Sequence, residues 1–156
     1  MAIGSEMSGG VKNVIVRDCE LGNLIYGMQI KGSKERGGFV EDIVVKDCDL
    51  QQIKIVTSFN YNRDGAPAPE IPVFRNIEFT NLNITKANTK VPVIYIEGFD
   101  DPEHYTRNII LKNLKLPENS TVYLKNCDNI IFENVLEVPS NKKPIYYITS
   151  SSNIKY

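Results

Sequence analysis

The sequence is poor in alanine and cysteine and has no long apolar run. Only 4 of its 156 residues are alanine, a strong helix former, whereas isoleucine and valine together number 32. Three cysteines are an odd number and cannot form a complete set of disulfides. No run of about 18 apolar residues is present, so no transmembrane helix is expected. This composition predicts an all-β chain with no membrane partner.

Charge of one sign is also lacking. Lys and Arg number 18 against 19 Asp and Glu, which gives a net charge of −1 and disfavours nucleic acid as a partner. The single histidine, His104, and the absence of a Cys-x-x-Cys pair predict neither a metal nor a cofactor. Residues 1–10 lack the basic and apolar segments of a signal peptide. Unpaired cysteines favour a reducing, cytoplasmic compartment. Secretion remains open, because a signal peptide could lie on an upstream part.

A ten-residue phrase occurs five times and decides the fold. Each copy begins with a charged residue followed by Asn or Asp, at Asn13, Asp42, Asn76, Asn108 and Asn129. The intervals between these positions are 29, 34, 32 and 21 residues. Between its polar ends each phrase is apolar or alternates apolar and polar residues, as a buried strand does. A strand that returns at such intervals predicts a β-helical solenoid.

A second polar position lies five residues after the first in every phrase: Asp18, Asp47, Asn81, Asn113 and Asn134. Asn and Asp tolerate left-handed backbone, so each is expected to form its own turn. Side chains in the same slot of successive coils would also stack and hydrogen-bond along the solenoid. Cys19 and Cys48 share the slot next to this position, where later copies carry Leu82, Leu114 and Val135, and are interpreted as core residues.

Each phrase is followed by a second strand candidate. These candidates are Leu24–Lys31, Ile53–Ser58, Val91–Glu97, Thr121–Asn126 and Pro144–Thr149. The resulting rhythm predicts a single domain, residues 1–156, of about five to six coils. Residues 60–72 contain three prolines, which cannot donate to a strand ladder, so this segment is predicted to leave the coil. Residues 99–105 form a second, shorter excursion.

Three segments near the N-terminus carry a family resemblance: Ile3–Val11 (IGSEMSGGV), Gly27–Lys31 (GMQIK) and Glu35–Gly38 (ERGG). Their order and spacing resemble the polygalacturonase family, glycoside hydrolase family 28. The resemblance implies a right-handed parallel β-helix, in agreement with the repeats. It also implies an activity on pectin-type, galacturonide-containing polysaccharide by inverting hydrolysis.

The resemblance places the family's catalytic acids before the counterpart of Ile3, in segments that this chain does not contain. Inversion needs one carboxylic acid to protonate the leaving oxygen and a second carboxylate to activate water. We therefore assign no catalytic residue, and expect a C-terminal portion of a larger hydrolase that is inactive alone. Asp100 and Asp101 are adjacent acids outside the family's context and, like His104, are interpreted as surface residues. The alternative is a non-catalytic carbohydrate-binding or structural module.

Five residues are candidates for substrate binding. The resemblance implies that Lys31 binds a substrate carboxylate, while Gln29 replaces an arginine of the family pattern. Gln29 and Lys31 are two residues apart and share a strand face. Arg36 is a candidate replacement cation or a turn residue. Tyr61 and Arg63 open the proline-rich excursion and are candidates because an aromatic ring can stack on a sugar face and a guanidinium can pair with a carboxylate. The expected ligand is a uronate-containing oligosaccharide or polysaccharide.

The first coil is also expected to bind protein. A β-helix that begins at Ile3 presents strand edges and apolar side chains at the end of its stack. We expect homo-oligomers through this coil, or pairing with a separate N-terminal half.

Overall fold

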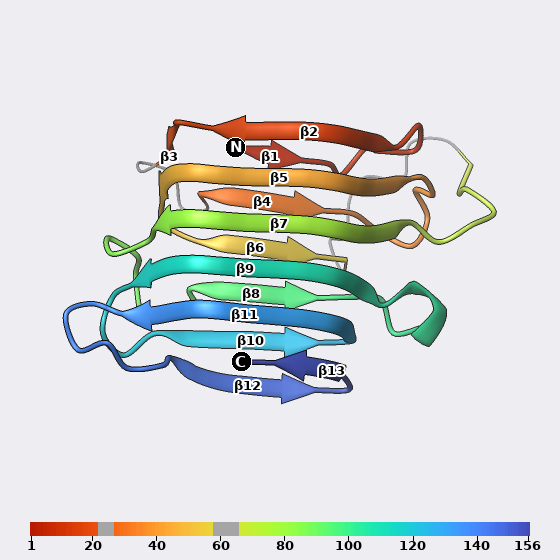
Figure 1. Cartoon of the computed structure of the whole chain (residues 1–156). Helices are drawn as coiled ribbons and strands as arrows, with labels where there is room; N and C mark the ends of the chain where they lie inside the picture. Colours follow the sequence, from red (N-terminus) through yellow and green to blue (C-terminus); the bar gives the residue numbers. More distant parts are fainter. Residues whose placement is uncertain (22–26, 58–65) are drawn as a thin grey trace.

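The computed structural model describes residues 1–21, 27–57 and 66–156 and shows a right-handed parallel β-helix, as predicted (Figure 1). Every strand pairing is parallel, within two sheets. The short-strand sheet has the order β1 (Ala2–Ile3), β4 (Met28–Lys31), β6 (Ile53–Val56), β8 (Ile94–Glu97), β10 (Thr121–Lys125), β12 (Ile145–Thr149). The long-strand sheet has the order β13 (Ser152–Lys155), β11 (Cys127–Glu137), β9 (Thr106–Leu116), β7 (Val73–Asn83), β5 (Phe39–Leu50), β2 (Val11–Arg17), with β3 (Glu20–Leu21) also paired to β5.

The chain alternates between the two sheets, which lie one behind the other with their strands running in opposite directions (Figure 1). The long strands contain the five repeated phrases, and the short strands match the second strand candidates with narrower limits. Strand β4 begins at Met28, and residues 24–26 of the predicted segment lie outside the described residues. The sequence repeat therefore corresponds to one coil of the solenoid.

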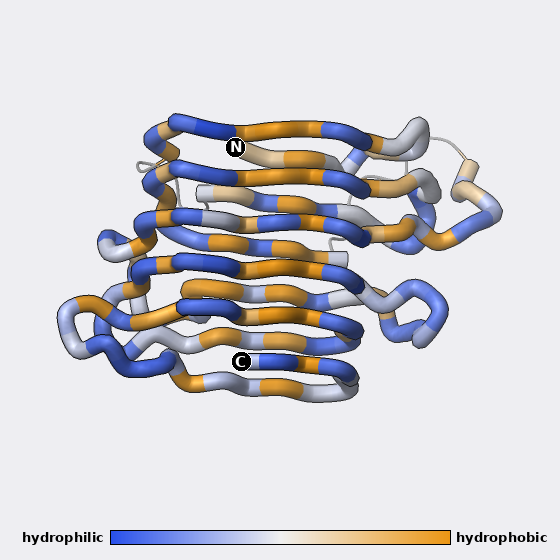
Figure 2. The backbone as a smooth tube through the Cα atoms, in the orientation of Figure 1, coloured by the Kyte–Doolittle hydropathy of each residue, from blue (hydrophilic) through white to orange (hydrophobic). Residues whose placement is uncertain are grey.

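Side chains in the same slot of successive coils stack into columns inside the solenoid. Register pairs Ile43 with Ile77, Ile77 with Ile109 and Ile109 with Ile130, and all four side chains are buried. A parallel column in the short-strand sheet joins Met28, Ile53, Ile94 and Val122, each fully buried. Figure 2 shows the same layout along β2, β9 and β11, where a hydrophobic centre lies between hydrophilic ends. Burial of these columns is the main stabilising contribution.

Both polar positions of each phrase have left-handed backbone. The φ angles of the ten Asn and Asp residues lie between 53° and 58°. Left-handed backbone costs most L-residues about 1–2 kcal/mol, and Asn and Asp tolerate it best after glycine. Each corner turns the strand. Between the corners alternate residues face the core, as Ile43 and Val45 do, while Ile15 and Ile110 face outward. The predicted turn role is confirmed.

The same side chains form two ladders along the solenoid, which confirms the predicted stacking. In the first ladder the amide Nδ2 of Asn76 donates to Oδ1 of Asp42, Asn108 donates to Asn76 and Asn129 donates to Asn108, each at 3.0 Å. The second ladder links Asp47, Asn81, Asn113 and Asn134 in the same way at 2.9–3.0 Å. An amide both donates and accepts, so each asparagine can pass the chain of bonds to the next coil.

Aspartate ends each ladder on the N-terminal side. A carboxylate accepts but does not donate, so Asp42 and Asp47 receive a bond from the following coil and pass none to the preceding one. Asp42 instead lies 3.4 Å from the Lys12 ammonium. Asp47 has Asp18 as its neighbour in the preceding coil, because Arg17 pairs with Lys46. Two like charges are therefore adjacent at this corner, which is unfavourable.

The excursions leave the coil between short and long strands. Residues 99–105 contain a 3-10 helix, Pro102–His104, capped by the Asp101 side chain. Residues 66–72 of the proline-rich excursion contain no strand, and residues 58–65 lie outside the described residues. Strands β1 and β2 end their sheets on the N-terminal side. Association with another chain through this edge stays a prediction.

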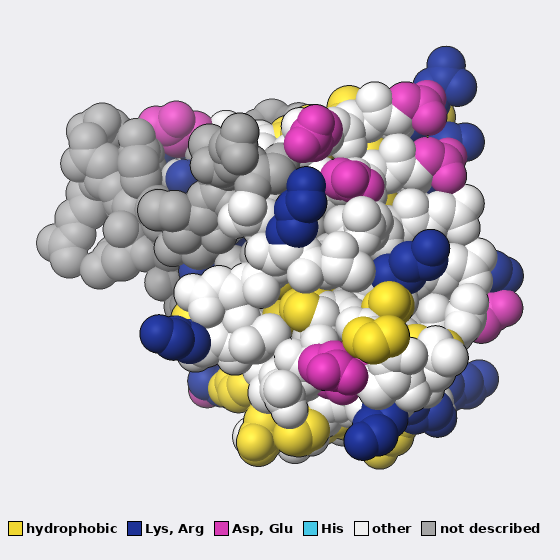
Figure 3. Space-filling model, turned by 90° about the vertical axis from the view of Figure 1, so that its left-hand side faces the viewer, with side chains coloured by type: hydrophobic (Ala, Val, Ile, Leu, Met, Phe, Trp, Pro, Cys, Tyr) yellow, Lys and Arg dark blue, Asp and Glu magenta, His cyan; other side chains and the backbone are white. Residues whose placement is uncertain are grey.

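The side of the molecule on which the long strands end carries charges of both signs. Figure 3 views this side and shows Lys and Arg interspersed with Asp and Glu, while hydrophobic side chains gather in its lower half, toward the C-terminal coils. In the C-terminal coils Tyr146 packs edge-on against Phe132, with ring centroids 5.1 Å apart, and stacks on Tyr156 at 4.5 Å. These rings cover the last turns of the interior.

We predict that Asn113→Ala destabilises the protein more than Asn113→Gly. Alanine loses two ladder hydrogen bonds and is strained in left-handed backbone, whereas glycine loses only the bonds. Expected losses in the free energy of unfolding are about 2–4 kcal/mol for alanine and about 1–2 kcal/mol for glycine. Denaturant unfolding measures both. Asn119→Ala, at a left-handed corner outside the ladders, is the control for strain alone. Equal effects of the two Asn113 variants would contradict the strain component.

We also predict that Asp47→Asn stabilises the protein. The new amide extends the second ladder to Asp18 and removes one of two adjacent like charges. The expected gain is about 0.5–1.5 kcal/mol, the net contribution of one hydrogen bond. Thermal unfolding at neutral pH measures the change, with Asp49→Asn as a control on the same strand. A lower melting temperature than the parent would show that the ladder does not extend beyond Asp47.

Candidate functional site

The outward face of the short-strand sheet collects side chains from successive coils into two files. We call this surface the short-strand face. One file contains Gln29, Lys54, Tyr95, Tyr123 and Tyr147, and the other contains Lys31, Val56, Glu97, Lys125 and Thr149. The alternating residues point inward and are buried, as Met28 and Ile30 are in β4. The face thus combines cationic, aromatic and amide groups with one carboxylate, Glu97, on paired strands, and Val56 is the one buried member of its second file.

The structure places two predicted binding residues side by side on this face. Gln29 and Lys31 are both half-buried and project from β4, as their spacing predicts. Gln29 pairs in register with Lys54, which adds a second cation one coil further on. Arg36 is half-buried in the turn between β4 and β5, where its backbone N–H donates to the Ser33 carbonyl at 3.2 Å. Tyr61 and Arg63 lie outside the described residues.

A tyrosine stack follows on the same face. The rings of Tyr95 and Tyr123 are stacked, with centroids 4.8 Å apart and planes 14° from parallel. The Lys54 ammonium lies 5.8 Å from the Tyr95 ring centroid, within range of a cation–π contact. Tyr147 continues the file and is 55% exposed. Because Tyr95 and Tyr123 stack, one face of each ring is covered by the other ring.

Glu97 holds this part of the face together. One carboxylate oxygen accepts a hydrogen bond from the Tyr95 hydroxyl at 2.7 Å, and the other lies 3.2 Å from the Lys125 ammonium. Burial raises the pKa of Tyr95, and the Glu97 carboxylate raises it further. Glu97 also raises the pKa of Lys125. Both partners of Glu97 therefore keep their protons at neutral pH.

Sequence reasoning missed Lys54, the tyrosine stack and the Glu97 cluster. A signal for them exists in the second strands, because Lys54, Tyr95, Tyr123 and Tyr147 occupy the same slot of successive copies. When the short strands are aligned on their buried residues, these four outward residues fall at the same position. The repeat in the short strands is harder to recognise than the ten-residue phrase of the long strands, because it is less regular.

A hollow of about 600 Å³ lies where the excursions meet the starts of the long strands. Its lining includes Phe39, Glu41, Glu70, Ile71, Arg75 and His104. Glu41 joins three coils, because its oxygens bond Lys12 Nζ at 2.8 Å and Arg75 Nη2 at 2.7 Å. These two hydrogen bonds lower the pKa of Glu41.

The half-buried His104 lies in the shorter excursion and lines this hollow. Its Nδ1 lies 3.1 Å from Oδ2 of Asp101, whose other oxygen accepts the backbone N–H of Glu103. The Glu103 N–H and then the histidine lower the pKa of Asp101. Asp101 acts here as the cap of the 3-10 helix, a structural role. Asp100 is exposed, as predicted.

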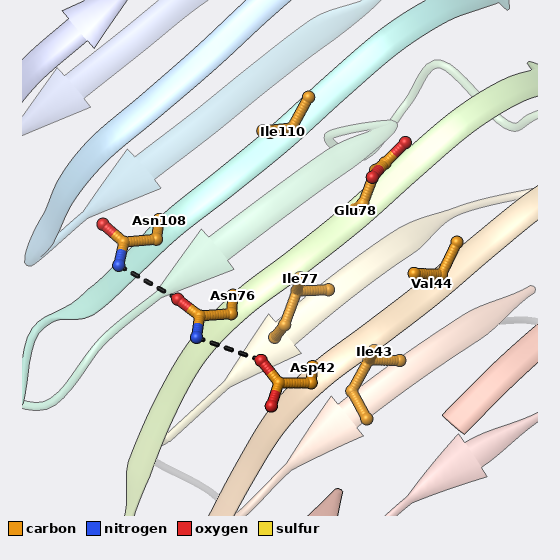
Figure 4. Close-up of a pocket in the computed structure, with 8 residues that line it drawn as sticks. All are labelled: Asp42, Ile43, Val44, Asn76, Ile77, Glu78, Asn108 and Ile110. Atoms are coloured by element: carbon orange, nitrogen blue, oxygen red, sulfur yellow. Dashed lines mark hydrogen bonds between the residues drawn. The ribbon is translucent and has the colours of Figure 1, made fainter. Parts of the chain in front are cut away.

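A second hollow, of about 360 Å³, lies on the outside of the long-strand sheet. Figure 4 shows Asp42, Asn76 and Asn108 of the first ladder along one side and Val44, Glu78 and Ile110 along the other. Asp42, Asn76 and Asn108 bond to each other within the ladder, and Glu78 accepts a hydrogen bond from the Thr80 hydroxyl at 2.6 Å. The hollow is a by-product of the corner geometry.

Neither a metal centre nor a spanning helix is found in the part of the chain that the structure describes. No group of three or more His, Cys, Asp or Glu side chains there is placed to hold a metal ion. No described helix is long and apolar enough to cross a membrane.

The strand order, the corner ladders and the flat short-strand face define the class of right-handed parallel β-helix proteins. The family model described as glycosyl hydrolases family 28 matches residues 1–141, and the chain belongs to this family. The resemblance seen in residues 3–38 is thereby confirmed.

A solved structure supports the fold. The chain is similar to the family 28 exopolygalacturonase of Yersinia enterocolitica, with a TM-score of 0.72 and 17% sequence identity. The likeness covers 98% of this chain and 28% of that enzyme, so the chain spans less than a third of its length. No curated protein matches the chain.

We predict that Glu41→Gln destabilises the protein at neutral pH and that the deficit disappears in acid. The pKa of Glu41 is lowered on folding, so its contribution is present above its ordinary value of 4.5 and is lost as pH falls through the folded value. Thermal unfolding of both proteins between neutral and strongly acidic pH measures the difference. Glu133→Gln is the control, because Glu133 is exposed and pairs with Lys112 at the surface. A deficit that persists unchanged in acid would contradict a charge-based role.

Proposed function

We propose that this chain forms part of a polygalacturonase-like hydrolase and binds uronate-containing polysaccharide on the short-strand face. The observation that carries the proposal is the pairing of Lys31 with Gln29 on one rigid strand, inside the segment that resembles the family pattern. Membership of glycosyl hydrolases family 28 supports the same class of substrate.

The residues of the face suit an acidic sugar. Lys31 supplies a compact cation for a carboxylate, and Lys54 supplies a second cation in the next coil. Gln29 offers an amide to sugar hydroxyls but no charge-assisted pair, so it selects less strongly for a carboxylate than arginine. Arg36 lies in the turn that follows Lys31 and is the proposed third cation. Tyr61 and Arg63 complete the proposed set.

Hydrolysis by inversion requires two carboxyl groups about 6.5–9.5 Å apart on either side of the scissile bond. Within the described strands of the short-strand face, Glu97 is the single carboxylate. Its two oxygens bond Tyr95 and Lys125. We therefore propose that these 156 residues alone bind substrate without cleaving it, and that the catalytic acids come from another part of the enzyme.

The same observation favours a second candidate function. A face with cations and tyrosines but without a pair of free acids also suits a non-catalytic carbohydrate-binding module. The two functions differ in whether a supplied N-terminal half restores hydrolysis of polygalacturonate. Reducing-sugar release by the chain alone and by the mixture separates them.

We predict that Lys31→Ala weakens binding of oligogalacturonate roughly tenfold or more, the effect of one charge-assisted hydrogen bond. Gln29→Arg is expected to tighten binding, because it restores a planar bidentate partner for the carboxylate. Isothermal titration with oligogalacturonate measures both, and a neutral galactose oligomer tests the charge requirement. Lys142→Ala, in an exposed turn far from β4, is the matched control. Equal affinity of the parent and Lys31→Ala would overturn the proposed site.

A further inference from the structure

Cys19 and Cys48 are neighbours in adjacent coils. Arg17 pairs with Lys46 and Glu20 pairs with Asp49, so the two cysteines between these pairs occupy the same slot. The backbone N–H of Asp49 donates to the Cys19 carbonyl at 3.0 Å, which fixes this register at the cysteines themselves.

The two side chains also have matching orientations. The Cys19 Sγ lies 3.0 Å from the Arg17 carbonyl oxygen, and the Cys48 Sγ lies 3.0 Å from the Lys46 carbonyl oxygen. Each thiol thus bonds the carbonyl two residues before it, and both project in the same direction from neighbouring strands. Cys127 is distant from this pair in register and bonds Lys125 in β10.

We propose that Cys19 and Cys48 are a disulfide-forming pair that links the first two long strands reversibly. Neighbouring strands lie about 4.8 Å apart, within the range of about 4.4–6.8 Å that disulfides span between Cα atoms. Side chains in register on parallel strands must close to about 3.8 Å between Cβ atoms. That approach strains the bond and makes it easy to reduce, which is the property of a labile disulfide.

The order of reaction follows from burial. Cys19 is half-buried, whereas Cys48 is 3% exposed. Burial raises the pKa of the Cys48 thiol, and the hydrogen bond with the Cys19 backbone offsets part of that rise. The Cys19 thiolate is therefore the group that attacks a small disulfide such as oxidised glutathione, and one glutathione thiolate leaves. Cys48 then loses its proton to solvent, and its sulfur displaces the second glutathione. Two protein thiols are oxidised and one external disulfide is reduced.

The disulfide would link the first two coils at the N-terminal end of the long-strand sheet. Cys19 precedes β3, which pairs only with β5 among the described strands. In later coils Leu82, Leu114 and Val135 hold this slot by packing. A covalent link closes a loop between the first two coils and reduces the freedom of the unfolded chain. Oxidation is therefore expected to raise the melting temperature, and reduction to return it.

The test uses the full chain treated with oxidised glutathione at mildly alkaline pH. We expect two of the three thiols to be lost from titration, and peptide mapping without reductant to join Cys19 to Cys48. Cys127→Ser keeps both cysteines of the pair and should still form the bond, with a rise in melting temperature that dithiothreitol reverses. Cys19→Ser should prevent it, and Cys48→Ser should stop at the mixed disulfide on Cys19.

Three titratable thiols after oxidation would overturn the proposal, and so would a bond that involves Cys127 or joins two chains. Mapping of the parent protein needs no substitution, so the proposal stays testable even if a serine variant fails to fold. Oxidation rates that rise with pH are expected because each of the two exchange steps requires a thiolate.

Discussion

The paired left-handed corners of each long strand are the constraint on which the rest of the structure depends. Ten Asn and Asp residues adopt φ angles that most side chains avoid, and the two ladders connect the corners of successive coils. A corner in one coil is stabilised by the corner above it, so the coils must stay in register. The buried columns and the outward files both follow from that register.

The short-strand face gains its properties from the same register. Side chains that are 24 or more residues apart in sequence become neighbours, as Gln29 and Lys54 do. The strands fix their backbone and their direction, so binding groups need little ordering when a ligand arrives. The hollow near Glu41 differs, because it is built at the junction with the excursions. Its shape depends on segments with no repeat.

Features that repeat in a regular phrase could be predicted from the sequence. Contacts between coils could not be predicted where the interval between equivalent residues varies. Asn81 and Asn113 recur in a clear phrase, so their corners and ladder were predicted correctly. Tyr95 and Tyr123 also recur in one slot, but their strands are short and separated by unequal intervals, which hides the alignment. Glu41 bonds partners from the coils on either side, and a charged residue at the start of a phrase does not by itself reveal which neighbour it meets. Strand limits were also too wide, as for β4, because turn residues next to a strand share its composition.

The ladders have a direction. Every amide nitrogen faces the preceding coil and every bonding oxygen faces the following one, with carboxylates at the first positions. A further coil with asparagine at both corners, inserted between β5 and β11, could both donate and accept and would keep the two ladders continuous. A second coil with aspartate at both corners would lose one hydrogen bond in each ladder, because a carboxylate cannot donate. The middle of the solenoid therefore suits added asparagine-bearing coils, whereas Asp42 and Asp47 suit the first rung of each ladder.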